Sequence, residues 1–318
     1  MSTKTDDIGF TRGLGNRKRY LFFAALAVIY IAFSVFVKGF FSWTALGNIL
    51  VEISIPSLVS LGLTFVIISG NWDLSFGSVA GIASMTTCYV TSITGNMFLG
   101  ILSGLMVALL AGIVNGAFVS YFGLSDVIIT IGTGSIYFGL SYLYSGGYHI
   151  HENLGDSFGF LYAGSVGPFP VPTILLGAIC LGAYITFNRA KIGRAFYSTG
   201  LARTAAIFSG VNTEFCKMLA FVICGLLAGI GGILTASENK SAWVLIGQDY
   251  LLTDYAIVFL GWAIFDKPSV IGTLVGAFFL GTISTGFVMA GVPFYVRNLG
   301  TGALLLIAIT IGAERQES

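Results

Sequence analysis

Long stretches of this chain carry no charged side chain. Residues 20–37, 74–125 and 218–237 contain no Asp, Glu, Lys or Arg. Only 9% of the 318 residues are charged and 56% are hydrophobic, whereas an ordinary soluble domain has about 25% charged residues. A chain of this composition cannot cover a water-facing surface, and a lipid environment removes that need. The sequence therefore predicts an integral membrane protein.

The membrane spans are predicted to be α-helices, because residues 21–37 lack the alternation of apolar and polar side chains that a barrel strand requires. A helix needs about 20 residues to cross the hydrocarbon core. The apolar runs break at the polar turn of residues 91–96 and at the Gly- and Pro-rich residues 164–172. They predict an all-α polytopic membrane protein with about ten transmembrane helices, at roughly 20–38, 52–70, 75–92, 97–120, 125–145, 171–188, 215–236, 250–265, 269–290 and 294–312.

The distribution of Lys and Arg predicts the orientation of these helices. With a cytoplasmic N-terminus, twelve of the 15 basic residues fall on the cytoplasmic side, and only Lys38, Lys240 and Arg297 fall outside. This asymmetry agrees with the positive-inside rule. We therefore expect cytoplasmic tails at residues 1–19 and 313–318, which flank a single transmembrane domain at residues 20–312. The first apolar run is too long for a cleaved signal peptide, whose apolar region has about 7–15 residues.

Several classes of function leave no trace in the sequence. There is no GxxxxGK[ST], HExxH or GxSxG motif, and the net charge of +1 gives no argument for a nucleic-acid partner. His149 and His151 lie near Glu152 and Asp156, where a solvated loop is favoured over a metal site. The four cysteines, which lie in or beside apolar stretches, are predicted to be buried small hydrophobes. We predict no catalytic residue, no metal and no cofactor bound by this chain.

The longest predicted cytoplasmic segment spans residues 189–214. A short helix at residues 204–209, ended by Gly210, fits its sequence. The small side chains of Ala205 and Ala206 would leave a shallow surface against which another protein could pack. Composition alone favours the alternative, a connecting loop that carries positive-inside charges.

Three sequence motifs resemble the ribose-type permeases of ATP-binding-cassette (ABC) importers. Residues 189–214 resemble the family's coupling loop and are called the coupling loop below. This loop and the residue before it match that family at Asn188, Arg189, Gly193, Arg194, Gly200, Ala205, Ala206 and Gly210. Residues 67–79 resemble the family motif Ile-x-Gly-Gly-Ile-Asp-Leu-Ser-Val-Gly-Ser through Gly70, Asp73, Leu74, Ser75 and Gly77. The third motif comprises residues 209–212 and 224–234. The likeness runs from about residue 40 to 312, with departures at Thr204, at Asn71 and Trp72, and at residues 262–269.

This resemblance implies a permease subunit of an ATP-driven importer in the bacterial cytoplasmic (inner) membrane. Its solute would be a small neutral monosaccharide, such as a ribose-like pentose, a hexose or an autoinducer-2-like furanose. The implied partners are an ATPase subunit, which binds ATP and Mg²⁺, a second permease subunit, identical or related, and a periplasmic or lipid-anchored solute-binding protein. The ATPase-coupling residues would be Gly200, Arg203, Thr204, Ala205, Ala206 and Gly210. The alternative, a self-sufficient secondary transporter or channel, is disfavoured because facing acids or Lys–Asp pairs are not apparent in the spans.

A few polar residues in or beside the spans are candidates for the solute pathway. Glu52, Asn115 and Thr130 could line it, although Glu52 could lie at the membrane interface and Asn115 could bond to another helix. Asp73 could line the pathway or set a gate, or either Asp73 or Ser75 could cap the helix that follows. Arg203 could meet an acidic partner or be one more positive-inside charge. The GxxxG pairs 112/116, 225/229 and 272/276 are predicted to be helix-packing faces.

Overall fold

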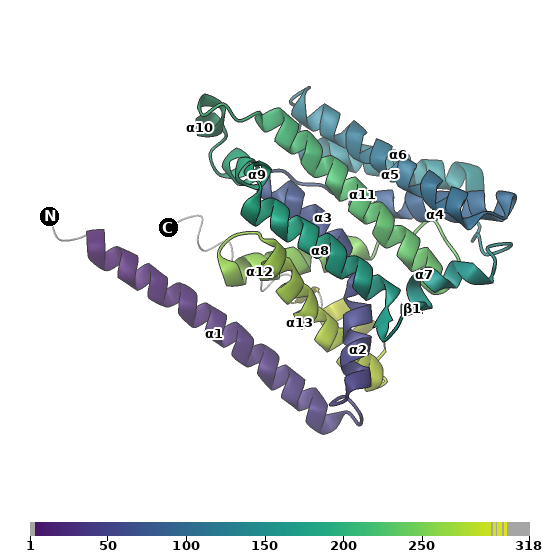
Figure 1. Ribbon diagram of the computed structural model, residues 1–318, viewed down its shortest axis with the longest axis horizontal. Coiled ribbons are helices and arrows are strands. Elements are labelled where there is room, and N and C mark those ends of the chain that lie inside the picture. Colours follow the sequence, from purple (N-terminus) through teal and green to yellow (C-terminus); the bar gives the residue numbers. More distant parts are fainter. Residues whose placement is uncertain (1–3, 294, 297, 301, 304–318) are drawn as a thin grey trace. The chain divides into compact units, whose positions relative to one another are not determined.

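Helices form nearly all of the regular structure in the computed structural model, which describes residues 4–293, 295–296, 298–300 and 302–303 (Figure 1). Among these residues, six helices are long and apolar enough to cross a membrane: α4 (Phe76–Thr94), α5 (Met97–Ser120), α6 (Asp126–Ser145), α8 (Val171–Arg189), α11 (Thr213–Asn239) and α13 (Val270–Met289). Each matches one of the predicted spans to within a few residues. The multi-pass and mostly helical character of the chain is thereby confirmed.

The remaining predicted spans differ in form. Residues 22–36 of α1 (Lys4–Phe36) and all of α12 (Tyr250–Phe265) are apolar but shorter than 18 residues. The predicted helix at 52–70 corresponds to α3 (Ser54–Ile68), and a separate short helix, α2 (Trp43–Glu52), precedes it. Pro56 explains the interruption between α2 and α3, because it has no N–H to donate to the carbonyl of Glu52. Most of the predicted span 294–312 lies outside the described residues.

The chain divides into two compact units. The larger, residues 54–255, contains α3 to α11 and the start of α12. Within it, α4, α5, α6 and α11 lie side by side (Figure 1). Short elements join α6 to α8: a 3₁₀ turn η1 (Asp156–Gly159), α7 (Phe160–Ala163), and the antiparallel strands β1 (Ser165–Val166) and β2 (Phe169–Pro170). The smaller unit comprises the described residues up to 53 and from 256 onward, with α13 packed against α1 and α2.

Glycine faces bring helices of each unit into backbone contact. A Cβ on Gly112 of α5 would lie 2.7 Å from the carbonyl oxygen of Phe221 in α11, and one on Gly225 would lie 3.0 Å from the Cα of Gly112. In the smaller unit, a Cβ on Gly276 of α13 would lie 2.3 Å from the carbonyl oxygen of Ile257 in α12. Small residues permit such contacts where lipid supplies no hydrophobic drive for helix association. The predicted packing role of the three GxxxG pairs is confirmed.

The segment between α11 and α12, residues 240–249, does not lie apart from the helices as the predicted outer loop would. A Cβ on Gly77 of α4 would be 2.4 Å from the carbonyl oxygen of Gly247, and one on Gly81 would be 3.4 Å from that of Val244. Ala242 and Val244 are buried in a cluster with Met85, Cys88 and Phe158. The segment is therefore an irregular stretch packed along a membrane-spanning helix, which is tolerated where protein covers the backbone.

Candidate functional site

A break between α3 and α4, residues 69–75, is the centre of the site. The helix α3 ends in a Schellman motif, in which the N–H of Gly70 donates to the carbonyl of Ile67 at 3.0 Å and that of Asn71 to the carbonyl of Val66 at 3.1 Å. Gly70 has a φ of +81°, a left-handed conformation that glycine adopts without strain. The sequence therefore ends α3 here by local backbone chemistry. The next helix begins only at Phe76.

Asp73 organises the hydrogen bonds at this break. Its side chain is buried, and Oδ1 accepts hydrogen bonds from the N–H and the Oγ of Ser75, at 2.8 and 2.6 Å. Asn115 of α5 donates from Nδ2 to Ser75 Oγ at 2.7 Å. Burial raises the pKa of the Asp73 carboxyl above its usual value, and the hydrogen bonds from Ser75 oppose this shift. Ser75, the N-cap residue of α4, makes no side-chain cap bond of its own.

Side chains of α6 and α12 hold the backbone of the break. Asp126 accepts from the N–H of Trp72 at 2.7 Å, and Thr130 Oγ1 accepts from the N–H of Leu74 at 3.1 Å. The hydroxyl of Tyr255 in α12 donates to the carbonyl of Asp73 at 2.8 Å, while its ring stacks on that of Trp72 at 5.9 Å. Three backbone groups that no helix satisfies are thus paired with side chains. We name residues 69–75 and these partners the break network.

A second buried acid, Asp254, lies on α12 one residue before Tyr255. Its Oδ1 accepts from Ser60 Oγ of α3 at 2.7 Å, and its Oδ2 has no hydrogen-bond partner among the described residues. Asp254 is not among the site residues predicted from the sequence. Acidic residues are rare inside membrane-spanning apolar runs and are usually functional there, so this position could have marked Asp254 in the sequence.

The coupling loop folds into two helices, α9 (Lys191–Leu201) and α10 (Arg203–Phe208). The second confirms the short helix predicted at 204–209, and Gly210 follows it with a φ of +78°. Phe196 of α9 is fully buried, with its ring centroid 5.7 Å from that of Phe65 in α3 and 5.9 Å from that of Phe187 in α8. The helix α9 is thus packed onto the transmembrane helices.

The end of α9 touches the break itself. A Cβ on Gly200 would lie 2.1 Å from the carbonyl oxygen of Ile68 and 2.9 Å from the amide nitrogen of Gly70. In turn, a Cβ on Gly70 would lie 3.1 Å from the Cα of Gly200. Only glycine at position 200 allows two backbones to approach so closely. Two motifs that are about 130 residues apart in sequence therefore meet in space.

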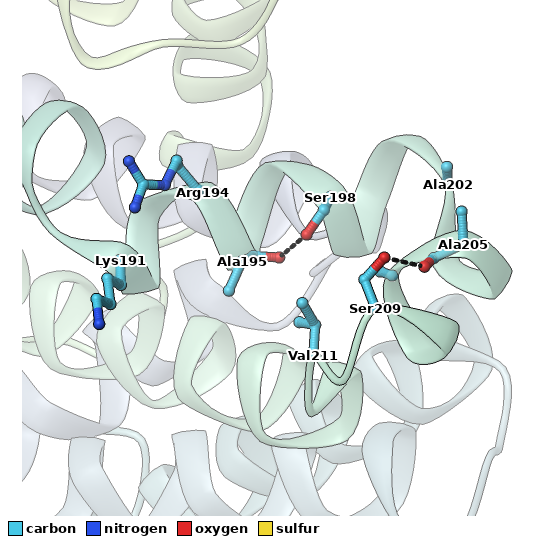
Figure 2. A pocket seen from close by; sticks show the side chains of 9 residues that line it. Lys191, Arg194, Ala195, Ser198, Ala202, Ala205, Ser209 and Val211 are labelled. Carbon is cyan, nitrogen blue, oxygen red and sulfur yellow. Dashed lines mark hydrogen bonds between the residues drawn. The ribbon is translucent and has the colours of Figure 1, made fainter.

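The helix α10 exposes apolar side chains beside a cavity. Phe208 is 87% exposed, and Leu201, at the end of α9, is 83% exposed. A cavity of about 410 Å³ lies beside them, lined by Lys191, Arg194, Ala195, Ser198, Ala202, Ala205, Ala206, Ser209 and Val211 (Figure 2). The hydroxyls of Ser198 and Ser209 donate to the carbonyls of Ala195 and Ala205. The cavity therefore has a mostly apolar floor of alanines, with two cationic side chains at one end.

Arg203 forms an ion pair with Glu214, with 2.7 Å between Nη2 and Oε1. The side chains are 52% and 29% exposed, and exposed pairs contribute only about 0–1 kcal/mol. Replacing Arg203 with alanine is therefore expected to lower the free energy of unfolding by less than about 1 kcal/mol. Unfolding of the detergent-solubilised protein at low and high salt measures this. A larger loss would mean that the pair positions α10 against α11.

The structure thus gathers some of the predicted site residues and separates others. Gly70, Asp73, Leu74, Ser75, Asn115 and Thr130 meet in the break network, and Gly200 contacts it. Arg203, Thr204, Ala205 and Ala206 lie on α10, and Gly77 faces residues 240–249. Glu52 belongs to the smaller unit, where Ser284 donates to its Oε1 at 2.7 Å. Sequence reasoning did not find Asp126 or Tyr255, because their partners are distant in sequence.

No group of three or more His, Cys, Asp or Glu side chains that could hold a metal ion occurs in the part of the chain that the structure describes. His149 stacks on Trp243, with the ring centroids 5.7 Å apart. The four cysteines are buried and free, in agreement with their predicted role as small hydrophobes.

Comparison with known proteins identifies the family. The profile described as branched-chain amino acid transport system / permease component matches residues 45–309. The ribose import permease protein of Escherichia coli K12 is 27% identical over 92% of this chain and 92% of its own length. The D-allose transport system permease protein of the same strain is 28% identical over 92% and 91%. The autoinducer 2 import system permease protein of Enterobacter sp. strain 638 is 30% identical over 79% of each chain. The chain belongs to the branched-chain amino acid transport system permease component family, and it is a multi-pass membrane permease subunit of an ABC importer.

Proposed function

We propose that this chain forms half of a solute pathway in the cytoplasmic (inner) membrane of a bacterium and that a separate ATPase subunit drives it. The observation that carries the proposal is the placement of the coupling loop, which is exposed at one end and packed against the protein at the other. At one end, α10 presents exposed apolar side chains beside a cavity. At the other end, α9 packs against the backbone of the break between α3 and α4. A surface so exposed on one side and so firmly packed on the other suits a docking site for a moving partner.

The proposed arrangement has ten spans, with both termini in the cytoplasm. The asymmetry of Lys and Arg supports this orientation, since it puts α9 and α10 on the cytoplasmic side, where ATP is available. ATP and Mg²⁺ would be bound by the ATPase subunit and not by this chain. A second permease subunit, identical or related, would complete the pathway. A periplasmic or lipid-anchored binding protein would deliver the solute.

The proposed solute is a small neutral monosaccharide, such as a ribose-like pentose, a hexose or an autoinducer-2-like furanose. The relatives named for ribose, D-allose and autoinducer 2 import support this class. The buried polar groups of the break network also support it, because a neutral, hydroxyl-rich solute needs hydrogen-bonding partners but no fixed counter-charge. Asn115, Thr130 and Glu52 stay candidates for contact with the solute.

Reconstitution tests this function. The permease, with the ATPase and binding protein that co-purify with it, is placed in liposomes, and uptake of radiolabelled D-ribose, D-allose and autoinducer 2 is measured. We expect uptake of one of them only with hydrolysable ATP. Uptake by the permease alone under a proton or sodium gradient would instead establish the secondary-transporter alternative.

Deleting residues 205–210 is expected to leave the protein inserted in the membrane but to abolish ATP-dependent uptake, because α10 and its exposed Phe208 are then missing. The measurement is co-purification of the ATPase together with solute uptake. Glu214→Gln is the control, since it breaks the ion pair with Arg203 and leaves α10 in place. Full ATPase association in the deletion variant would contradict the assignment of α10 as the docking helix.

A further inference from the structure

The contact between Gly200 and the backbone of residues 68–70 links the coupling loop to the break network. We propose that this contact transmits movement of the docked ATPase to the buried polar groups between α3 and α4. The inference rests on the proposed function, and it adds a specific route. The route runs from α9, through two glycines, to the residues that α5, α6 and α12 hold in place.

The first step of the route is the rigid attachment of α9. Phe196 is buried between Phe65 and Phe187. A Cβ on Gly193 would lie 2.3 Å from the carbonyl oxygen of Thr186, so the start of α9 also rests directly on the backbone of α8. Because packed interiors are nearly incompressible, a force on α10 displaces α9 as a body and does not deform it.

The second step is the glycine contact itself. At Gly200, backbone meets backbone, with no flexible side chain between them that could absorb a shift. A Cβ would overlap the Ile68 carbonyl oxygen at 2.1 Å, well inside any van der Waals separation. Movement of α9 toward α3 must therefore push residues 68–70. These residues form the left-handed turn that ends α3.

The third step is the spread of this movement through the break network. The three residues after Asn71 each give one backbone group to another helix: the N–H of Trp72 to Asp126, the N–H of Leu74 to Thr130, and the carbonyl of Asp73 to Tyr255. A displaced turn at residues 68–70 changes these bonds within two to four residues. Both α6 and α12 then respond, because their side chains hold the break.

Replacing Gly200 with alanine tests the route in the assembled importer of permease, ATPase and binding protein. We expect ATPase association and ATP hydrolysis within twofold of the wild-type values, but at least a tenfold fall in sugar taken up per ATP hydrolysed. The probes are the three sugars named above. Gly182→Ala is the matched control, because Gly182 lies on the neighbouring helix α8 and a Cβ there would meet nothing within 4 Å. It is expected to keep wild-type coupling.

Two outcomes of this experiment overturn the inference. Wild-type uptake per ATP in Gly200→Ala would show that the contact carries no movement. Loss of ATPase association in that variant would assign the contact to docking. The proposed function fails separately, and takes this inference with it, if the wild-type permease neither associates with an ATPase nor takes up solute with ATP.

A second measurement keeps the test decisive if Gly200→Ala does not fold. Trp72 is 43% exposed and lies in the break, so its fluorescence reports on that segment. In a chain with Trp43, Trp243 and Trp262 replaced by phenylalanine, which must still support uptake, we expect the emission of Trp72 to shift when a nonhydrolysable ATP analogue binds the complex. Unchanged emission, with the analogue bound, would overturn the inference.

Discussion

Replacing Asp73 with alanine is expected to lower the free energy of unfolding by about 1–3 kcal/mol and to abolish solute uptake. The Oδ1 atom of Asp73 accepts hydrogen bonds from both the N–H and the hydroxyl of Ser75, and Asp73 is buried. Ser75 also receives the bond from Asn115, so the loss extends to α5. Unfolding of the solubilised protein and uptake in liposomes measure the two effects.

Asp73→Asn is the matched control for this change. Asparagine keeps one acceptor oxygen of the same size, so it can still bond to Ser75, although the charge is lost. We expect it to recover most of the stability that alanine loses. Equal stability of the alanine variant and the wild type would show that the break is held by its other bonds alone.

Replacing Gly77 with alanine is expected to destabilise the protein by about 1–3 kcal/mol, the usual cost of overpacking a close-packed interior. The added Cβ would lie 2.4 Å from the carbonyl oxygen of Gly247, so residues 240–249 must shift away from α4. That segment leads directly into α12, which carries Asp254 and Tyr255. We therefore also expect lower uptake, measured beside thermal unfolding.

Gly81→Ala separates this clash from the intrinsic effect of alanine in a helix. Gly81 lies one turn further along α4 and faces the same segment, but a Cβ there would be 3.4 Å from the carbonyl oxygen of Val244. This is close to ordinary contact, and alanine has the better helix propensity. We expect Gly81→Ala to be neutral or slightly stabilising. Equal losses at both positions would contradict the proposed clash.

Sequence reasoning found those parts of the fold that depend on local composition. Charge-free runs predicted most of the spans, and glycine spacing predicted their packing faces. Gly210 marked the end of α10, and the polar residues 91–96 marked the turn between α4 and α5. The family resemblance singled out residues of the break as a motif, but it did not predict which residues they contact.

The contacts that make the site could not be read from the sequence, because they join distant residues. Tyr255 and Asp73 are separated by 182 residues, and no periodicity relates them. The packing of residues 240–249 against α4 was missed because a polar, Gly-containing stretch looks like any exposed loop until its neighbours are known. The interruption between α2 and α3 at residue 53 was detectable, since Pro56 follows shortly after it.

The smaller unit is built from the two ends of the chain, since α1 and α2 pack with α13, and more than 200 residues separate α2 from α13. During synthesis at about 5–20 residues per second, the first helices leave the ribosome at least ten seconds before their partner. They must wait in the bilayer or beside the insertion machinery while residues 54–255 assemble. Truncation of the last helices would therefore leave α1 and α2 without the helix α13 against which they pack.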